Sequence, residues 1–269
     1  GYKIIPILIR DVDTNAIYLK ADFDILNNPQ KTLVSDEMYK VGDKYVIDDT
    51  SFIGTVGFKL NDNADSFIIG VLTREDQLGQ INRFISNERE FNLIHHDEYY
   101  ATEDMGNTGN GTLTVNGNGK LIDFSNYYGF VLDDNNANAK LSIKDAYITN
   151  SPVAIQSEVT GISDYNIILD NVVMSGNDAS LSNIAGRVLI KNSEFKVDDN
   201  KHNTIKNENG YINIENSKIF NNIDNNGTID IGGQNYLGSE DNSILLSGNG
   251  YINITNDAVY TDMRYVQIT

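Results

Sequence analysis

Two eleven-residue stretches of the chain show the same alternation of apolar and polar side chains. They are GYINIENSKIF at residues 210–220 and GYINITNDAVY at residues 250–260. In each stretch one polar residue separates two isoleucines, which is the period of a β-strand with one buried face. A separation of about forty residues is too long for a hairpin, so the pattern predicts equivalent strands in a larger repeated unit.

The same strand pattern recurs through the second half of the chain. The intervals between recurrences run from about 17 to about 28 residues and average about 23. Repeats of this length are typical of solenoids, because one unit cannot bury its apolar face until neighbours stack on it. The short interval before Ile229 leaves the register open there. The first apolar residue of each strand, which we call the anchor, is Leu113, Leu141, Ile167, Val188, Ile212, Ile229 or Ile252.

This alignment predicts two columns of inward-facing apolar side chains, one on each side of a corner. The first column would contain Ile143, Leu169, Ile190, Ile214, Ile231 and Ile254. The second would contain Ile148, Met174, Phe195, Ile219, Tyr236 and Val259.

The position four residues after each anchor holds only glycine, asparagine or aspartate. These residues enter the left-handed backbone region most cheaply, since glycine lacks a Cβ and the other two hydrogen-bond locally. The position therefore predicts a sharp corner, and corners stacked about 4.8 Å apart would let side-chain amides form a ladder. The predicted corner ladder is Gly117, Asp145, Asn171, Asn192, Asn216, Gly233 and Asn256.

A coil of about 23 residues with a polar asparagine corner between two strands resembles the right-handed parallel β-helix. Pectate-lyase-like enzymes, phage tailspikes and the passenger domains of bacterial autotransporter adhesins share that architecture. The resemblance covers about residues 113 to 269 and is one of architecture, not of an active-site motif. We therefore expect an all-β protein with β-helix repeats over residues 106–269, which begin near the glycine-rich MGNTGNGT at residues 105–112.

Residues 1–105 do not follow the repeat. AIYLKADFDI at residues 16–25 and FIGTVGFKL at residues 52–60 alternate as one-sided strands. Between Glu75 and Glu90 the pattern changes to a helical spacing, which is compatible with one short amphipathic helix. Because an exposed solenoid end would pair with other chains, we expect either a β-rich cap or irregular early coils. The residues at helical spacing are Leu78, Ile81, Phe84 and Ile85.

The charge and composition limit the classes of partner. A net charge of −18 argues against nucleic acid and anionic lipid, which both need a basic face. The absence of cysteine excludes disulfides and thiolate metal sites. No apolar run approaches the roughly 18 residues of a membrane span, so we expect no direct membrane insertion by this segment. Because the chain opens on Gly1 instead of methionine, we expect a fragment of a larger exported protein.

Two short tracts contain metal-ligand residue types. HHDE, from His95 to Glu98, would place two potential ligands on each face of a strand, although a solvated polar loop is the simpler interpretation. DVDTN, from Asp11 to Asn15, supplies only the first three ligand positions of a calcium loop. We therefore expect no metal site and no cofactor, with calcium as a minor alternative.

An enzyme on this scaffold would need acidic residues clustered in one groove. Adjacent acids are frequent in so acidic a chain, and adjacency in sequence is not proximity in space. The repeat has only two arginines to neutralise an acidic sugar, Arg187 and Arg264, and no tryptophan to stack on one, although Tyr127 and Tyr128 could stack. We identify no catalytic residue. The acid pairs are Asp133–Asp134, Asp198–Asp199 and Glu240–Asp241.

The sequence thus favours an extracellular bacterial surface adhesin that resembles an autotransporter passenger segment. Its partner would be another cell surface, a receptor or glycan of a host or partner bacterium, or its own copies. The alternatives are a polysaccharide lyase or glycoside hydrolase on a β-helix, and a phage tailspike that binds a receptor. The sequence identifies no ligand-binding residue.

Overall fold

The structure, a computed structural model, is all-β in the part that it describes. That part comprises residues 8–10, 17–19, 31–33, 38–41, 44–48, 55–59, 67–70, 88–93, 97–101, 104–108, 111–133, 138–160, 163–196 and 203–269. Over these ranges the secondary structure consists of strands and their connections, without a helix. Accordingly, none of these segments forms a helix of the length and apolar character that crossing a membrane requires.

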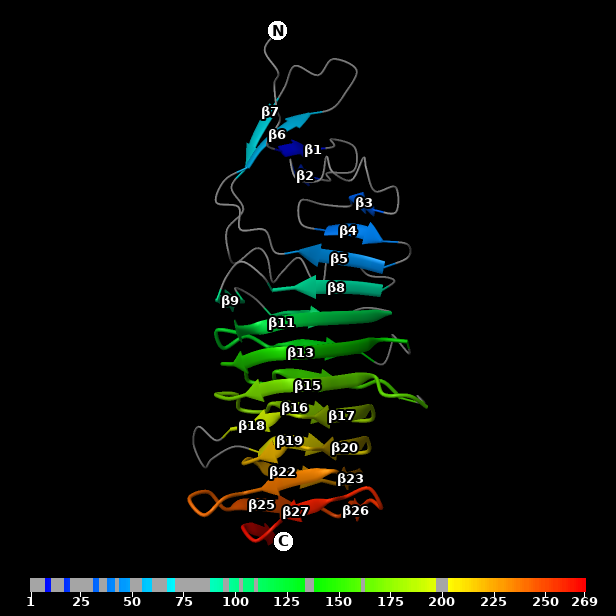
Figure 1. The fold of residues 1–269 in the computed structure, drawn as a ribbon, viewed down its shortest axis with the longest axis vertical. Coiled ribbons are helices and arrows are strands. Elements are labelled where there is room, and N and C mark those ends of the chain that lie inside the picture. Colours follow the sequence, from blue (N-terminus) through cyan, green and yellow to red (C-terminus); the bar gives the residue numbers. More distant parts are fainter. Residues whose placement is uncertain are drawn as a thin grey trace.

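From residue 88 onward the chain winds into coils of three strands, and each strand pairs in parallel with its equivalents in the neighbouring coils. Figure 1 shows these strands stacked along the long axis of the molecule, from β8 to β27 near the C-terminus. The stack has three sides, which we call the first, second and third faces.

The first face is formed by the anchor strands. They are β8 (Glu88–Asn92), β11 (Thr112–Asp123), β13 (Lys140–Thr149), β15 (Ile167–Met174), β17 (Arg187–Lys191), β20 (Tyr211–Glu215), β23 (Thr228–Gly232) and β26 (Tyr251–Ile254). The strands β11, β13 and β15 continue past the corner, so their later residues belong to the second face.

The second face follows the corner, and the third face completes the coil. Besides the ends of the three long strands, the second face contains β9 (Glu98–Tyr100), β18 (Glu194–Phe195), β21 (Lys218–Ile219), β24 (Gln234–Leu237) and β27 (Tyr260–Asp262). The third face is an eight-stranded sheet of β10 (Gly106–Asn107), β12 (Phe130–Leu132), β14 (Ile155–Ser157), β16 (Leu181–Asn183), β19 (Asn203–Asn207), β22 (Asn222–Asn225), β25 (Ile244–Ser247) and β28 (Val266–Ile268).

The register of the first face confirms the sequence alignment at every anchor. Each of the seven anchors lies directly opposite the next, from Leu113 to Ile252. Ile212 pairs with Ile229, which establishes the register that the short interval before Ile229 left open. Length differences therefore fall outside the paired anchor positions, in the connections between strands and in the corner at residues 117–119.

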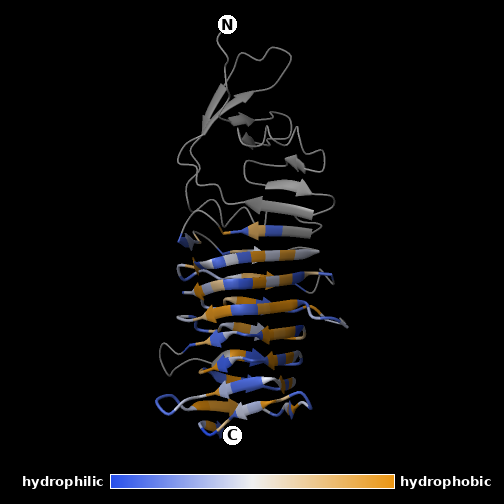
Figure 2. Cartoon of the chain, in the orientation of Figure 1, coloured by the Kyte–Doolittle hydropathy of each residue, from blue (hydrophilic) through white to orange (hydrophobic). Residues whose placement is uncertain are grey.

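The interior of the stack is a continuous apolar core. The predicted first column pairs in register from Ile143 to Ile254, and its members are buried until the last coil, where Ile254 is 53% exposed. Along the strands of Figure 2, hydrophobic and hydrophilic colours alternate in every coil, as expected when one face of each strand points inward.

The predicted second column is correct from Ile148 to Ile219 and wrong after that. Ile219 pairs with Leu237, whereas Tyr236 pairs with Lys218 and is not buried. One additional residue follows the corner at Gly233, and this shifts the inward positions by one. Val259, expected in the same column, is 82% exposed.

The strands upstream of residue 88 form two groups. One is a four-stranded sheet of β2 (Ile17–Leu19), β1 (Leu8–Arg10), β6 (Thr55–Lys59) and β7 (Phe67–Gly70). In the other, β3 (Lys31–Leu33), β4 (Met38–Val41) and β5 (Lys44–Asp48) pair antiparallel, and β5 pairs in parallel with β8. The strands expected at residues 16–25 and 52–60 correspond to β2 and β6.

The structure bears on the helix and on the domain boundary that were expected in this region. The four apolar residues of the expected helix lie outside the described residues, but its end at residues 88–90 belongs to strand β8, so the helix does not extend that far. Parallel pairing of β8 with β11 also crosses the expected boundary at residues 105 and 106. The extent of a cap stays a prediction.

The alternation on β17 yields a direct test of the core. Ile190 is fully buried, while its neighbour Leu189 points outward and is partly exposed. We expect Ile190→Ala to lower the free energy of unfolding by about 2–5 kcal/mol, because it removes buried methylene groups and leaves a cavity. Leu189→Ala, the matched control, should cost less than about 1 kcal/mol. Urea unfolding measures both, and equal losses would contradict the inward column.

Candidate functional site

The predicted corner adopts the left-handed conformation in five consecutive coils. The backbone φ angles lie between 49° and 67° at Asp145, Asn171, Asn192, Asn216 and Gly233. Each of these residues follows the last residue of a first-face strand or lies within a strand that bends there. The residue types at this position are therefore explained by the low cost of a positive φ for glycine, asparagine and aspartate.

The first predicted corner differs from this pattern. Gly117 does not have a positive φ, and Asn118 and Gly119 take the left-handed conformation in its place, with φ angles of 51° and 75°. Asn116 pairs with Lys144 and Lys120 pairs with Ala146, so this corner contains three residues opposite one. The extra residues move the bend away from Gly117.

The last predicted corner also differs, because Asn256 does not have a positive φ. It lies in a turn in which the backbone N–H of Ala258 donates to the carbonyl of Thr255 at 3.1 Å. The backbone N–H of Gly233 bonds to the carbonyl of Asp257, so Asp257 is the residue opposite the preceding corner. The bend is thus made by a turn and not by a single left-handed residue.

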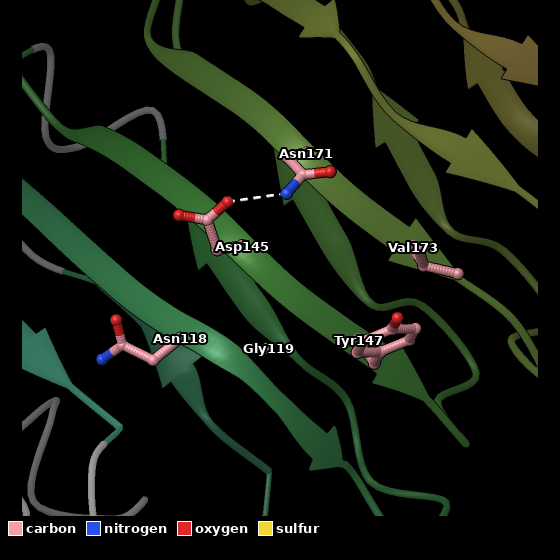
Figure 3. Close-up of a pocket in the computed structure, with 6 residues that line it drawn as sticks. All are labelled: Asn118, Gly119, Asp145, Tyr147, Asn171 and Val173. Atoms are coloured by element: carbon pink, nitrogen blue, oxygen red, sulfur yellow. Dashed lines mark hydrogen bonds between the residues drawn. The ribbon is translucent and has the colours of Figure 1, made fainter.

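The corner side chains form hydrogen bonds between neighbouring coils. Asn171 Nδ2 donates to Asp145 Oδ1 at 2.7 Å, as Figure 3 shows, and Asn192 Nδ2 donates to Asp170 Oδ1 at 2.8 Å. Asn216 Oδ1 accepts from the backbone N–H of Gln234 at 2.9 Å. The partner changes from coil to coil, so these side chains do not form one uniform amide ladder.

A shallow depression of about 380 Å³ lies over this corner (Figure 3). Among the described residues that line it, the one carboxylate is Asp145, which already accepts the hydrogen bond from Asn171. These lining residues therefore do not supply the paired carboxylates that cleave glycosidic bonds. Its lining is Asn118, Gly119, Asp145, Tyr147, Asn171 and Val173.

A second asparagine ladder, which the sequence reasoning missed, lies inside the molecule at the end of the third face. Asn183 Nδ2 donates to Asn207 Oδ1 at 2.9 Å, and Asn207 Nδ2 donates to Asn225 Oδ1 at 2.8 Å. All three side chains are buried, so the amides satisfy one another's hydrogen-bonding groups, which water cannot reach.

Glycines stack beside this buried ladder, two residues before the anchor of each later coil. A Cβ on Gly210 would lie 2.0 Å from Asn183 Nδ2, and one on Gly227 would lie 2.2 Å from the carbonyl oxygen of Gly210. Only glycine fits such close approach. The signal was present in the sequence, since this glycine opens both GYINI segments. The series is Gly186, Gly210, Gly227 and Gly250.

The outer side of the first face is locally basic across three coils. On β13, β15 and β17 it carries four cationic side chains and one carboxylate, although the whole chain has a net charge of −18. Such a reversal of sign in an acidic molecule marks a surface with distinct electrostatics. We call this surface the basic face; its outward residues are Lys140, Ser142, Lys144, Ile168, Asp170, Arg187, Leu189 and Lys191.

The carboxylate of the basic face, Asp170, interacts with two neighbouring side chains. Asp170 lies 3.0 Å from Lys191 Nζ and accepts the hydrogen bond from Asn192. Partial burial acts to raise the pKa of Asp170, but the hydrogen bonds from Asn192 and Lys191 outweigh it and lower the pKa. Asp170 therefore stays ionised and neutralises Lys191.

Arg187 lies over the ring of Tyr211 and close to that of Tyr165 on the same face. Its Cζ is 4.1 Å from the ring centroid of Tyr211 and 5.7 Å from that of Tyr165. The two ring centroids are 6.3 Å apart, at an interplanar angle of 36°. These distances are typical of cation–π contacts, which orient the planar guanidinium without neutralising its charge.

The two tyrosines are themselves fixed by hydrogen bonds. The Tyr211 hydroxyl donates to Asp230 Oδ2 at 2.6 Å, and the Tyr165 hydroxyl accepts from Asn213 Nδ2 at 3.1 Å. Burial, followed by the bond to Asp230, raises the pKa of Tyr211 far above its usual value, so this hydroxyl stays protonated.

Two polar atoms in this group are buried without a hydrogen-bond partner among the described residues. They are Arg187 Nε and Asn213 Oδ1. An unsatisfied buried polar atom costs about 1–3 kcal/mol, so its presence in a folded protein calls for an explanation.

The metal-ligand tracts lie largely outside the described residues. His95, His96 and the whole of DVDTN fall there, whereas Asp97 Oδ1 forms an ion pair with Lys120 Nζ at 2.8 Å. Glu98 Oε2 accepts a hydrogen bond from the Tyr100 hydroxyl. Among the residues with described positions, no three His, Cys, Asp or Glu side chains are arranged to hold a metal ion.

The acid pairs and aromatic candidates are dispersed. Asp134, Asp198 and Asp199 fall outside the described ranges, and Glu240 and Asp241 are exposed. Tyr127 and Tyr128 are 39% and 48% exposed in the connection between the second and third faces. Arg264 binds Asp262 with a shortest distance of 2.7 Å, whereas the described residues supply no acidic partner for Arg187.

Comparisons of the chain with protein-family models, with curated proteins and with solved structures found no match in any of the three.

Three glycine substitutions separate backbone strain from lack of space. Gly119→Ala should cost about 1–2 kcal/mol, since its φ is 75° but a Cβ would contact nothing within 4 Å. Gly210→Ala should cost about 3 kcal/mol or more, because its Cβ would collide with the buried Asn183 amide. Gly233→Ala combines both effects, with a φ of 67° and Asn216 Oδ1 at 2.4 Å. Urea unfolding measures the loss of stability in each variant. If the Gly210→Ala protein were as stable as the Gly119→Ala protein, the close packing of Gly210 against Asn183 would be contradicted.

The Asp262–Arg264 pair has a defined pH dependence. Hydrogen bonds from Arg264 lower the pKa of Asp262 from 3.8 to about 2. Because the folded-state pKa is depressed, the stabilisation is fully present above pH 3.8 and is lost as the pH falls towards 2. The melting temperature of Arg264→Gln should therefore lie below that of the wild type at pH 5 and approach it near pH 2. Lys206→Gln serves as control for charge loss alone. An unchanged carboxyl titration of Asp262 in Arg264→Gln, measured by NMR, would refute this pairing.

Proposed function

We propose that this chain is a segment of an extracellular bacterial surface adhesin of the autotransporter-passenger type, which attaches the cell to another surface or to its own copies. The observation that carries the proposal is the register of the first face, where seven successive anchors are directly opposite one another. This pairing turns the outward side chains into straight columns along the long axis of the molecule (Figure 1).

Such columns suit binding over an extended surface. Neighbouring parallel strands lie about 4.8 Å apart, so each coil repeats a contact at a short and regular spacing. One outward column contains Ser142, Ile168, Leu189, Asn213 and Asp230, a mixture of hydroxyl, apolar, amide and carboxylate groups. Many weak contacts in register add up to stable attachment without a deep pocket.

The charge of the chain governs self-association. Two copies with net charges of −18 repel one another, and salt screens this repulsion with a Debye length of about 8 Å at physiological ionic strength. Association through amide and hydroxyl groups should therefore strengthen with added salt or with calcium, which can bridge carboxylates.

The test displays the parent protein on bacteria that lack other adhesins and scores attachment and aggregation. Deletion of residues 113–269 should abolish both. Deletion of Val188–Tyr211 is the matched control: it removes one coil and joins Arg187 to Ile212, which occupies the position of Val188, so the register is kept. This variant should retain partial attachment.

Unchanged attachment after the full deletion would refute the adhesin proposal. Cleavage of a polysaccharide by the purified chain would point to the enzyme alternative, and a threefold assembly in solution would point to the tailspike.

A further inference from the structure

The basic face carries an arginine, Arg187, whose charge none of the described residues neutralises. Nothing in the described part of the chain pairs with the Arg187 guanidinium through an ion pair or a side-chain hydrogen bond; its contacts are the faces of Tyr165 and Tyr211. Of its three nitrogens, Nε is buried and unpaired, and the two terminal nitrogens are not among the buried unpaired atoms. The guanidinium therefore keeps donors of its planar fork for a ligand.

The surroundings favour an anionic group at this position. Lys140, Lys144 and Lys191 share the basic face with Arg187, while Asp170 is already occupied by Lys191 and Asn192. A second carboxylate, Asp164, approaches Lys140 only to 3.9 Å and is largely exposed. On the next strand, Glu215 lies opposite Lys191, so the acidic side chains are placed at the lysines and not at Arg187. An aromatic-stacked guanidinium without an acidic partner among the described residues matches the two oxygens of a carboxylate.

The rest of the face favours a saccharide over other carriers of a carboxylate. Ile168 and Leu189 form a partly exposed apolar strip next to Arg187, which suits the C–H side of a sugar ring. Ser142, which pairs with Ile168, places a hydroxyl beside that strip for a sugar hydroxyl. A nucleic acid or an anionic membrane would instead carry a high density of charge, which a chain of net charge −18 repels.

We propose that the basic face, centred on Arg187, binds a short saccharide with a single carboxylate, and that this carboxylate accepts hydrogen bonds from the Arg187 guanidinium. The apolar strip of Ile168 and Leu189 supports the ring of the same sugar. This inference builds on the proposed adhesin function, for which it names the ligand class and the binding surface.

The experiment measures binding of purified full-length chain to two pairs of probes. One pair is sialyllactose with lactose, and the other is a glucuronate-terminated disaccharide with its methyl ester. Saturable binding of at least one acidic probe, without binding of its uncharged counterpart, is the expected result. Binding should weaken with added salt, because a charge-assisted contact at the surface is screened.

Variants locate the site. Arg187→Gln should weaken binding of the acidic probe about tenfold or more, since hydrogen bonds to charged groups are worth that much. Arg187→Lys should give an intermediate loss, because it keeps the charge but not the planar fork. Lys206→Gln is the matched control: it removes one positive charge from the third face, where Lys206 is exposed, and should change binding less than twofold.

Each outcome decides the proposal. Failure of all acidic probes to bind, equal binding of acid and uncharged probes, or wild-type binding by a folded Arg187→Gln protein would each overturn it. If Arg187→Gln does not fold, the Arg187→Lys protein replaces it, and full retention of affinity there would overturn the guanidinium contact.

Cell attachment separates this site from the adhesin function. Displayed protein with Arg187→Gln that still attaches, while the deletion of residues 113–269 does not, would leave the adhesin proposal standing and refute this ligand. If the wild-type protein binds the acidic probe but the displayed wild type attaches to nothing, the ligand proposal would stand and the adhesin proposal would be refuted.

Discussion

The whole molecule depends on parallel pairing between equivalent positions of successive coils. Each coil is too small to bury its apolar side chains alone, and it becomes stable only when the coils above and below supply the missing contacts. Register is critical to this arrangement, because a slip of one residue would turn every buried isoleucine of a strand to the outside. The fixed register also creates the outward columns that the proposed functions use.

The corners allow the register to survive variation in length. Left-handed residues after the first face, and glycines packed beside buried asparagines before it, hold both ends of the anchor strands β17, β20 and β23. Other length differences lie in the connections between strands, and Tyr165 reaches the basic face from the one between β14 and β15. In this way a connection contributes a side chain to a regular surface.

The period-2 alternation was enough to predict the anchors, because an inward isoleucine at every coil is a strong and local signal. The shift at Tyr236 and the displaced corner beside Gly117 were not predictable in this way, since each depends on one additional residue whose effect appears only when neighbouring coils are paired. The cluster around Arg187 was even less accessible to sequence reasoning. It joins side chains from three coils, and no spacing in the sequence marks them as neighbours.

The direction of the backbone hydrogen bonds determines how the stack responds to a pull between its two ends. These bonds run along the long axis from coil to coil, so tension applied between the first and last coils loads them one after another and not all together (Figure 1). A released coil of about 23 residues extends from about 4.8 Å to about 80 Å. A stack of this kind would lengthen in steps under tension and absorb work, while the coils that remain closed keep their surfaces intact.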